Sequence, residues 1–236
     1  LASFSDRAGA HPSNGRDIGV QIQGDFLKNN AGRNLVHYQV GVFDGQGINV
    51  RDVDQQKNII GGVWVMPVDG MRLGCFGWTG SYARKGTWVD ENGVTQNGVR
   101  KLQQRRYAIS AEYAANDWTF RSEYIHSTGE AFAKSLVNTN DAAAKDCTLS
   151  SNGNKAQGVY ALVIAPIVKK KLYAKARYDM YQPSKGAEQQ RTLCEIGLNY
   201  DFNQNVQLSS EYAHVHDRSL AKPDYSVVDV QLIFKF

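Results

Sequence analysis

The carboxy-terminal stretch Val228–Phe236, with the sequence VDVQLIFKF, alternates in steps of two between apolar residues and residues that mostly suit water. The first set is Val228, Val230, Leu232, Phe234 and Phe236, and the second is Asp229, Gln231, Ile233 and Lys235. A period of two is typical of a β-strand whose two faces meet different surroundings. An aromatic last residue is typical of a strand that ends at the aromatic girdle of a membrane barrel. This stretch therefore predicts a strand with one face in lipid and the other in water.

The composition of the chain suits an all-β protein rich in tight turns. Its 236 residues include 12 Tyr, 9 Phe, 4 Trp and 22 Gly against 5 Pro. No apolar run approaches the roughly 20 residues of a membrane helix, but alternation hides a lipid-facing strand from such a search. The net charge of +4 is modest, so nucleic acid is not expected as a partner. The cysteines Cys75, Cys147 and Cys194 show no metal-ligand spacing and are expected to be isolated thiols.

The same alternation recurs along the chain and predicts about eleven strands without a convincing helix. Eight of them are clear, and they lie near residues 18–26, 36–42, 106–113, 118–124, 172–180, 191–200, 206–212 and 228–236. Three more, near 58–67, 71–82 and 158–167, have an ambiguous facing, because two of them contain nearly continuous apolar stretches.

The formal charges of the eight clear strands all fall on the polar side of the alternation. They are Asp25, Arg106, Glu112, Arg121, Glu123, Lys175, Arg177, Asp179, Arg191, Glu195, Glu211, Asp229 and Lys235. A soluble β-sandwich also keeps its charges on one side of each strand, so this pattern alone does not separate a sandwich from a membrane barrel.

The lengths of the connections separate the two architectures. Short connections near 67–70, 115–116, 168–171 and 203–205 alternate with longer ones near 83–105, 128–157, 182–189 and 216–224. Short turns at one rim and long loops at the other are typical of an outer-membrane barrel and are not expected of a Greek-key sandwich. We therefore predict a transmembrane antiparallel β-barrel in a single domain over residues 1–236, with long outer loops at 83–105 and 128–157.

The strand count bears on completeness. A bacterial single-chain barrel has an even number of strands and both chain ends at the periplasmic rim. If Phe236 lies at that rim, eleven strands place residues 1–16 at the outer rim. We therefore expect this chain to be the carboxy-terminal part of a larger barrel, without the amino-terminal strands of that barrel; the alternative is that the count of eleven is wrong by one strand.

In such a barrel the charged face lines the lumen. The pore-lining candidates are Arg106, Glu112, Arg121, Glu123, Lys175, Arg177, Asp179, Arg191, Glu195, Glu211 and Lys235. They could form basic rings that select anions, or acids and bases could pair along the wall and hydrate the lumen. The spacing of Arg121 with Glu123 and of Arg177 with Asp179 favours pairing. The candidates for the aromatic girdles, which the alternation places on the outward face, are Tyr107, Trp118, Tyr200, Tyr212, Phe234 and Phe236.

Several segments resemble the phosphate-selective porin O and P family of Gram-negative outer membranes. They are Asn14–Val20, Ile59–Gly74, Ala176–Asp179, Gly197–Asn203 and Val230–Phe236. The resemblance implies a sixteen-stranded trimeric barrel that passes anions, with this chain as strands six to sixteen. The selectivity residues of the family do not map onto these segments, so the resemblance assigns no phosphate site.

We expect an outer-membrane porin of a Gram-negative cell, a passive channel for small hydrophilic solutes with a preference for anions or phosphate. The expected partners are the lipid bilayer with its lipopolysaccharide, the solutes, further copies of the chain in a homotrimer, and the barrel-assembly machinery acting on the last strand. The alternative is a non-conducting barrel that acts as a structural or interaction partner in a surface complex, with its long loops docking other proteins.

An enzyme is not expected. His214 and His216 lie at the outer end of a strand beside Asp217, which would suit a metal or a catalytic pair, but no third ligand is identifiable. The sequence contains neither a nucleophile elbow nor a P-loop. We predict no metal and no cofactor, and an enzymatic barrel would have to lose its activity on the substitution His214→Ala.

Overall fold

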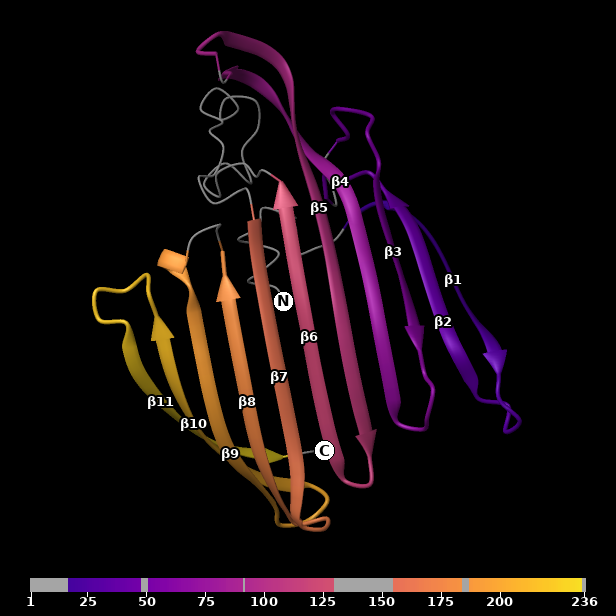
Figure 1. Cartoon of the computed structure of the whole chain (residues 1–236), viewed down its shortest axis with the longest axis vertical. Helices are drawn as coiled ribbons and strands as arrows, with labels where there is room; N and C mark the ends of the chain where they lie inside the picture. Colours follow the sequence, from indigo (N-terminus) through magenta and orange to yellow (C-terminus); the bar gives the residue numbers. More distant parts are fainter. Residues whose placement is uncertain (1–16, 48–50, 91, 130–154, 184–186, 235–236) are drawn as a thin grey trace.

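The computed structural model describes residues 17–47, 51–90, 92–129, 155–183 and 187–234. Within them, eleven strands pair in sequence order as one antiparallel sheet, shown in Figure 1. The strands are β1 (Gly19–Lys28), β2 (Asn34–Phe43), β3 (Asn58–Val65), β4 (Met71–Val89), β5 (Thr95–Ala115), β6 (Trp118–Gly129), β7 (Lys155–Val168), β8 (Leu172–Gln182), β9 (Arg191–Asp201), β10 (Val206–Asp217) and β11 (Asp224–Phe234). The eleven predicted strands are confirmed, including the three whose facing was ambiguous.

Helix is nearly absent from the described residues. A 3-10 helix of three residues, η2 (Ala187–Gln189), precedes β9. No helix in the described ranges is long and apolar enough to cross a membrane.

Neighbouring strands pair without losing the alternation, so one face of the sheet is polar and the other apolar across its width. Arg121 on β6 lies opposite Glu112 on β5 and Leu162 on β7, and Leu162 lies opposite Arg177 on β8. Continued across all strands, this register places every charged residue predicted for one face on that face, apart from Lys235, which lies outside the described residues. We call this face the polar face.

Exposure shows which way the sheet curves. On the apolar face, Val228 is 71% exposed and Ile196 is 65% exposed, whereas Glu195 on the polar face is 8% exposed. Side chains on the inside of a curved sheet crowd one another, and those on the outside spread apart. The polar face is therefore the concave face, and the large apolar side chains project from the convex face.

The connections fall into two classes, one at each end of the strands. β1–β2, β3–β4, β5–β6, β7–β8 and β9–β10 are joined by short turns at one rim, which we call the short-turn rim. The β5–β6 turn needs two residues, Asn116 and Asp117, with φ of 54° and 67°. Positive φ at both positions is the geometry of a type I′ turn, whose twist matches the strands of a hairpin. The opposite end is the long-loop rim.

One predicted outer loop is a hairpin. Residues 83–105 were expected to form a loop, but β4 and β5 continue pairing up to Val89 and Thr95 and are joined only by the short connection that follows. The hairpin rises above the rest of the sheet in Figure 1. Pairing continues because the two arms satisfy each other's backbone groups beyond the ends of β3 and β6. The second predicted loop, 128–157, lies mostly outside the described residues; its two ends, up to Gly129 and from Lys155, belong to β6 and β7.

On the polar face, aromatic rings lie over glycines. A Cβ added to Gly62 would come within 2.4 Å of the Phe76 ring, and one added to Gly74 would meet the same ring at 3.0 Å. The Phe76 ring also packs edge-on against Trp64, with centroids 4.5 Å apart. Because glycine has no side chain, the Phe76 ring can lie flat against the strands at these positions. The ring then covers the backbone in place of the missing side chains.

This packing yields a stability prediction. The substitution Gly62→Val should destabilise the folded protein by about 1–3 kcal/mol, because the new methyl groups overlap the Phe76 ring. The measurement is the urea unfolding midpoint of the full-length protein in detergent micelles. Gly77→Ala is the matched control, since an added Cβ there meets no atom within 4 Å. Adding Phe76→Ala to Gly62→Val should cost less than the sum of the two single changes, and strict additivity would contradict the overlap.

Candidate functional site

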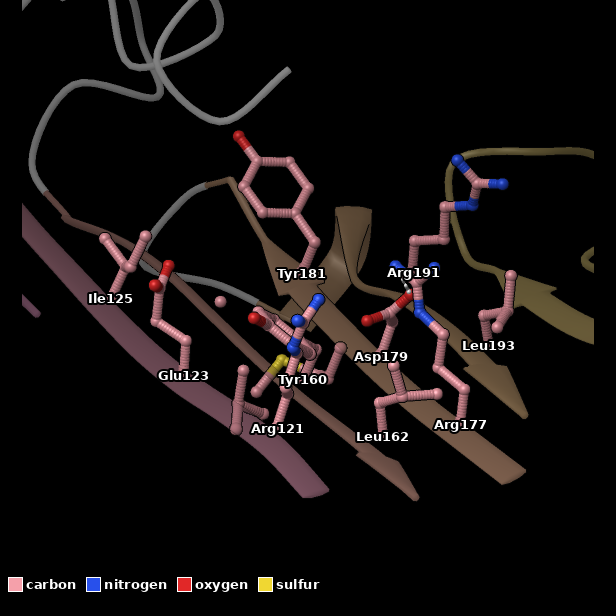
Figure 2. Close-up of a pocket in the computed structure, with 13 residues that line it drawn as sticks. Arg121, Glu123, Ile125, Tyr160, Leu162, Arg177, Asp179, Tyr181, Arg191 and Leu193 are labelled. Carbon is pink, nitrogen blue, oxygen red and sulfur yellow. Dashed lines mark ion pairs between the residues drawn. The ribbon is translucent and has the colours of Figure 1, made fainter. Parts of the chain in front are cut away.

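The polar face of β6–β9 carries a groove of about 520 Å³, shown in Figure 2. Its charged lining comes from Arg121 and Glu123 on β6, Arg177 and Asp179 on β8, and Arg191 on β9. These five residues are all pore-lining candidates from the sequence, and the register brings them onto one surface. The groove is thus a hydrated stretch of wall, not a closed pocket.

Acids and bases of this wall are paired, although not always as the sequence suggested. Arg177 binds Asp179 on its own strand, with Nη2 and Oδ2 2.7 Å apart, as predicted. Arg121 was expected to pair with Glu123, but its Nη2 lies 3.2 Å from Oε1 of Glu112. Residues directly opposite on neighbouring strands have closer Cβ atoms than residues two apart on one strand. Glu123 forms no ion pair within the described part of the chain and lies opposite Tyr160 on β7.

Three poorly exposed charges form a cluster across β8, β9 and β10. Lys175 Nζ lies 2.7 Å from Glu195 Oε1 and 2.6 Å from Glu211 Oε1. The side chain of Lys175 is 15% exposed and that of Glu195 is 9% exposed. Ser209 supports the cluster by donating from Oγ to Glu211 at 3.3 Å. One lysine thus holds two carboxylates, and the cluster ties three strands together.

Two further pore-lining candidates, Arg191 and Arg106, donate hydrogen bonds to uncharged side chains. Arg191 lies near β11 and donates from Nη2 to the hydroxyl oxygen of Tyr225 at 3.4 Å. Arg106 on β5 donates to Oε1 of Gln104 at 2.6 Å. Lys235 lies outside the described residues.

A second cluster on the polar face was not anticipated from the sequence. Four arginines line the β4–β5 hairpin: from the short-turn rim outward they are Arg72, Arg106 and then the directly opposite pair Arg84 and Arg100. We call them the arginine column. Each guanidinium lies over an aromatic ring: Arg72 over Trp64 at 4.5 Å, Arg106 over Trp78 at 4.8 Å, Arg84 over Tyr82 at 5.3 Å and Arg100 over Trp88 at 5.6 Å. Stacking on a ring fixes the orientation of a guanidinium on the wall.

Only one acid shares the polar face of these two strands within the described residues. It is Glu112, which lies opposite Arg72 in the register and is bound to Arg121. On β6–β11, by contrast, the described polar face carries more acids than bases. The wall is therefore close to neutral as a whole but positive along the hairpin.

Sequence reasoning found only Arg106 of the arginine column. Arg84 and Arg100 fell in the segment predicted as a loop, and Arg72 fell in a strand of ambiguous facing. The facing of that strand was ambiguous because its polar face carries apolar residues as well: Arg72 shares this face with Gly74, Phe76 and Trp78. The available signal was the pairing of a strand at 71–82 with the clear strand at 106–113, which would have fixed the face of Arg72.

At the long-loop rim, the connection between β2 and β3 is braced against the hairpin. Lys57 Nζ lies 2.9 Å from Asp44 Oδ1 and also binds Asp52. The two carboxylates raise the pKa of Lys57 above its ordinary value, and Asp44 has the larger effect. In turn, the hydrogen bond from Lys57 lowers the pKa of Asp52. Both groups therefore stay charged at neutral pH, and the contribution of Asp52 is lost only as the pH falls through its lowered value. Two hydrogen bonds join this connection to the β4–β5 hairpin. Ser81 Oγ donates to Asp54 Oδ2 at 3.2 Å, and Gln103 Nε2 donates to Gln56 Oε1 at 3.0 Å.

The girdle candidates within the described residues all lie on the apolar face. Trp118 is the first residue of β6, Tyr200 is next to last in β9, and Phe234 is the last of β11. Tyr107 lies opposite His126, near the end of β6 at the long-loop rim. Tyr212 was expected near a strand end but lies in the middle of β10, because this strand continues to Asp217; its hydroxyl is 2.8 Å from Ser226 Oγ. Phe236 lies outside the described residues.

The histidine pair does not use its sequence neighbour. His216 Nδ1 lies 2.7 Å from Asp224 Oδ1 on β11, and His214 Nε2 lies 3.6 Å from the same oxygen. Asp217, which the sequence suggested as the partner, accepts hydrogen bonds from Ser219. In the part of the chain that the structure describes, no group of three or more His, Cys, Asp or Glu could hold a metal ion.

Two of the three cysteines lie in the described ranges. Cys75 and Cys194 are free and exposed, and the register places both on the apolar face. Cys147 lies outside the described residues.

The comparisons with known proteins rest on structure, because no protein-family model and no curated protein matches the chain. The chain is similar to an anion-selective porin from Comamonas acidovorans, with a TM-score of 0.58 and 12% identity over 97% of this chain and 62% of that one. It is also similar to the outer-membrane channel DcaP of Acinetobacter baumannii, with a TM-score of 0.58 and 9% identity over 92% of this chain and 62% of that one.

These similarities define the fold. The chain has the architecture of the wall of an outer-membrane β-barrel, as the sequence predicted, and its described strands form an open sheet. It spans about three fifths of the length of the solved structures it matches.

The buried cluster yields the prediction of this section. The substitution Lys175→Met should destabilise the protein by about 1–3 kcal/mol, because it leaves two poorly exposed carboxylates without their partner. The measurement is urea unfolding of the full-length protein in micelles. The triple variant K175M/E195Q/E211Q should recover much of the loss, since it removes the unpaired charges together. Equal stability of wild type and K175M would show that the cluster contributes nothing.

Proposed function

We propose that the protein is a porin of a Gram-negative outer membrane, a passive diffusion channel for small hydrophilic solutes. The observation that carries this proposal is the division of the sheet between a concave face holding every strand charge predicted for it and a convex face of exposed Val, Ile, Leu and aromatic side chains. Such a sheet suits a barrel with lipid outside and water inside. The polar-face residues would then line the lumen, and Tyr107, Trp118, Tyr200 and Phe234 would lie in the membrane interfaces.

The proposed channel requires a closed wall. A bilayer core offers no water to the backbone, so the outer edges of β1 and β11 cannot stay unpaired there. We propose that further strands join these two edges, in keeping with the greater length of the similar porins. The number expected from the family resemblance is five, which gives sixteen strands in all.

The finer proposal is a preference for anions, supported by the arginine column. Four guanidiniums lie at three levels along a single hairpin that carries one acid, Glu112, while the other acids of the polar face lie on other described strands. Arg72 and Arg106 would attract anions within a narrow lumen bounded by low-dielectric walls, and Arg84 and Arg100 would attract them at its outer mouth. The similar porin from Comamonas acidovorans is anion-selective, which agrees with this preference. A homotrimer and a specific preference for phosphate, as in the porin family that the sequence resembles, belong to the same proposal.

Planar-bilayer electrophysiology tests the channel and its selectivity separately. The full-length protein should conduct, and its reversal potential in a salt gradient should show anion preference. Absence of conductance would refute the porin and favour a non-conducting structural or interaction barrel. Conductance with cation preference would refute only the anion proposal.

The arginine column can be tested by substitution. The double variant R72Q/R106Q should lower the anion-to-cation permeability ratio by about threefold or more. One charge removed about 7 Å from an ion in water changes its energy by about 0.6 kcal/mol, which is close to threefold in permeability. The control E112Q/R121Q removes a bound pair without changing the net charge and should leave the ratio unchanged. An equal effect of the two variants would contradict a special role of the column.

A further inference from the structure

The apolar face of β4–β8 is free of charge until it approaches the long-loop rim, where four cations appear. They are Lys85 on β4, Lys101 and Arg105 on β5, and Lys155 on β7, and all are exposed. We call them the outward basic strip. In the described parts of these five strands no acid faces this way, since Glu112, Glu123 and Asp179 all lie on the polar face. Among the described residues, only Lys101 of the strip has an acidic neighbour, the nearly buried Asp54 of the β2–β3 connection, at 4.0 Å.

The register places part of the strip in one row across the sheet. Arg105 lies opposite Thr79 on one side and Thr128 on the other, and Thr128 lies opposite Lys155. Trp118, at the short-turn rim, and Thr128 lie ten residues apart on β6. That is about 33 Å along a strand, or about 25 Å along the axis of a barrel with strands tilted by about 40°, which equals the height of the outward apolar band of such barrels.

The side chains just below this row have the character of a membrane interface. Tyr124 donates from its hydroxyl to Gln157 Oε1 at 3.1 Å, and Gln157 Nε2 donates to Gln182 Oε1 at 2.7 Å. The ring of Tyr107 packs against His126 with centroids 5.1 Å apart. Aromatic bodies with polar tips that bind part-buried amides suit the boundary between hydrocarbon and headgroups. The outward basic strip therefore begins where the headgroups of the outer leaflet would begin.

We propose that the outward basic strip binds the phosphate groups of an anionic glycolipid of the outer leaflet. The inference rests on the proposed function, because that sets the long-loop rim outside the cell. Lysine and arginine are the side chains that bind phosphate through charge-assisted hydrogen bonds, and cations beside an anionic lipid surface are attracted to it. The strip faces outward, away from the lumen, so its ligand is a component of the leaflet and not a solute in transit. Its single sign of charge, unlike the mixed polar face, is complementary to a phosphorylated headgroup.

The test is a lipid titration of the full-length protein folded in neutral detergent micelles. Bis-phosphorylated lipid A is the probe, and native mass spectrometry counts the lipids retained by each protein molecule. The variant K85Q/K101Q/R105Q/K155Q should bind lipid A at least tenfold more weakly than wild type. The control K169Q/K170Q/K171Q removes exposed lysines from the β7–β8 turn at the opposite rim and should bind as wild type does. Equal loss in both variants, or no loss in either, would overturn the proposal.

Further arms identify the ligand. Lipid A stripped of both phosphates should bind wild type at least tenfold more weakly, and equal binding would overturn the proposal. Inorganic phosphate at the same concentration as lipid A should not displace it; displacement would make the strip a site for the free anion and overturn the lipid assignment. A changed oligomeric state of the quadruple variant with unchanged lipid binding would assign the strip to a contact between copies instead.

Two controls make the result of the lipid titration unambiguous. One shows that each variant is folded, and the other tests the porin proposal separately from the lipid-binding proposal. Each variant should keep the heat-dependent shift in gel mobility of a folded barrel, and the charge-preserving variant K101R/R105K should bind lipid A as wild type does. Loss of binding in K101R/R105K would point to packing and contradict recognition by charge. Bilayer conductance should be the same in the quadruple variant and in wild type. A wild type that does not conduct would refute the porin while leaving the lipid titration to be read independently.

Discussion

The structure depends on one constraint, which is that a strand crossing a bilayer must satisfy all of its backbone hydrogen bonds through its neighbours. The eleven described strands pair strictly in sequence order, so that each of β2 to β10 meets this constraint through the strand before it and the strand after it, while β1 and β11 have one partner each. Unbroken pairing fixes the register, and the register fixes which face each side chain takes. Within the described strands the register shifts only near Pro166 in β7, where a proline cannot donate to the ladder. The extra residue there puts Val168 opposite Leu172 on the apolar face, although Pro166 lies opposite Tyr173 on the polar face. A slip of one residue anywhere would turn apolar side chains into the lumen and charges into lipid.

The same constraint explains why glycine and aromatic residues recur together on the polar face. A ladder of backbone bonds exposed to water in the lumen competes with that water, and a flat ring shields it. Phe76 lies over Gly62 and Gly74, and the Phe43 ring lies beside Gly41 in the same way. The rings then serve a second purpose, because Trp64 and Trp78 hold the guanidiniums of Arg72 and Arg106. The same aromatic side chains therefore pack the wall and position the positive charges.

Much of the fold could be predicted from the sequence, because a strand with lipid on one face and water on the other must alternate between apolar and polar residues. All eleven strands, the sharing of one face by the charges, and the two classes of connection follow from it. The hairpin at 80–104 could not be predicted, because no lipid imposes an alternation of apolar and polar residues above the membrane. There each arm of the hairpin satisfies its backbone hydrogen bonds through the other arm alone. The pairing of Arg121 with Glu112 depends on cross-strand register, which a single strand does not encode. The positions of Arg72, Arg84 and Arg100 were missed for these two reasons together.

The charges of the protein sort into three zones that correspond to three dielectric environments. In the crowded middle of the polar face, desolvation is costly, and Lys175 is neutralised by Glu195 and Glu211. Along the β4–β5 hairpin the guanidiniums are stacked on aromatic faces, which fix their positions and so place their positive charge on one part of the wall. On the outward face of β4–β8, the described residues carry no charge along the apolar band, and charge returns only beyond Tyr107 and Tyr124, with a single sign. A soluble sandwich has one solvent outside and would not require its surface charge to begin at a fixed height along the strands. The position at which outward charge resumes is therefore as informative about the surroundings of this sheet as the alternation of its last strand.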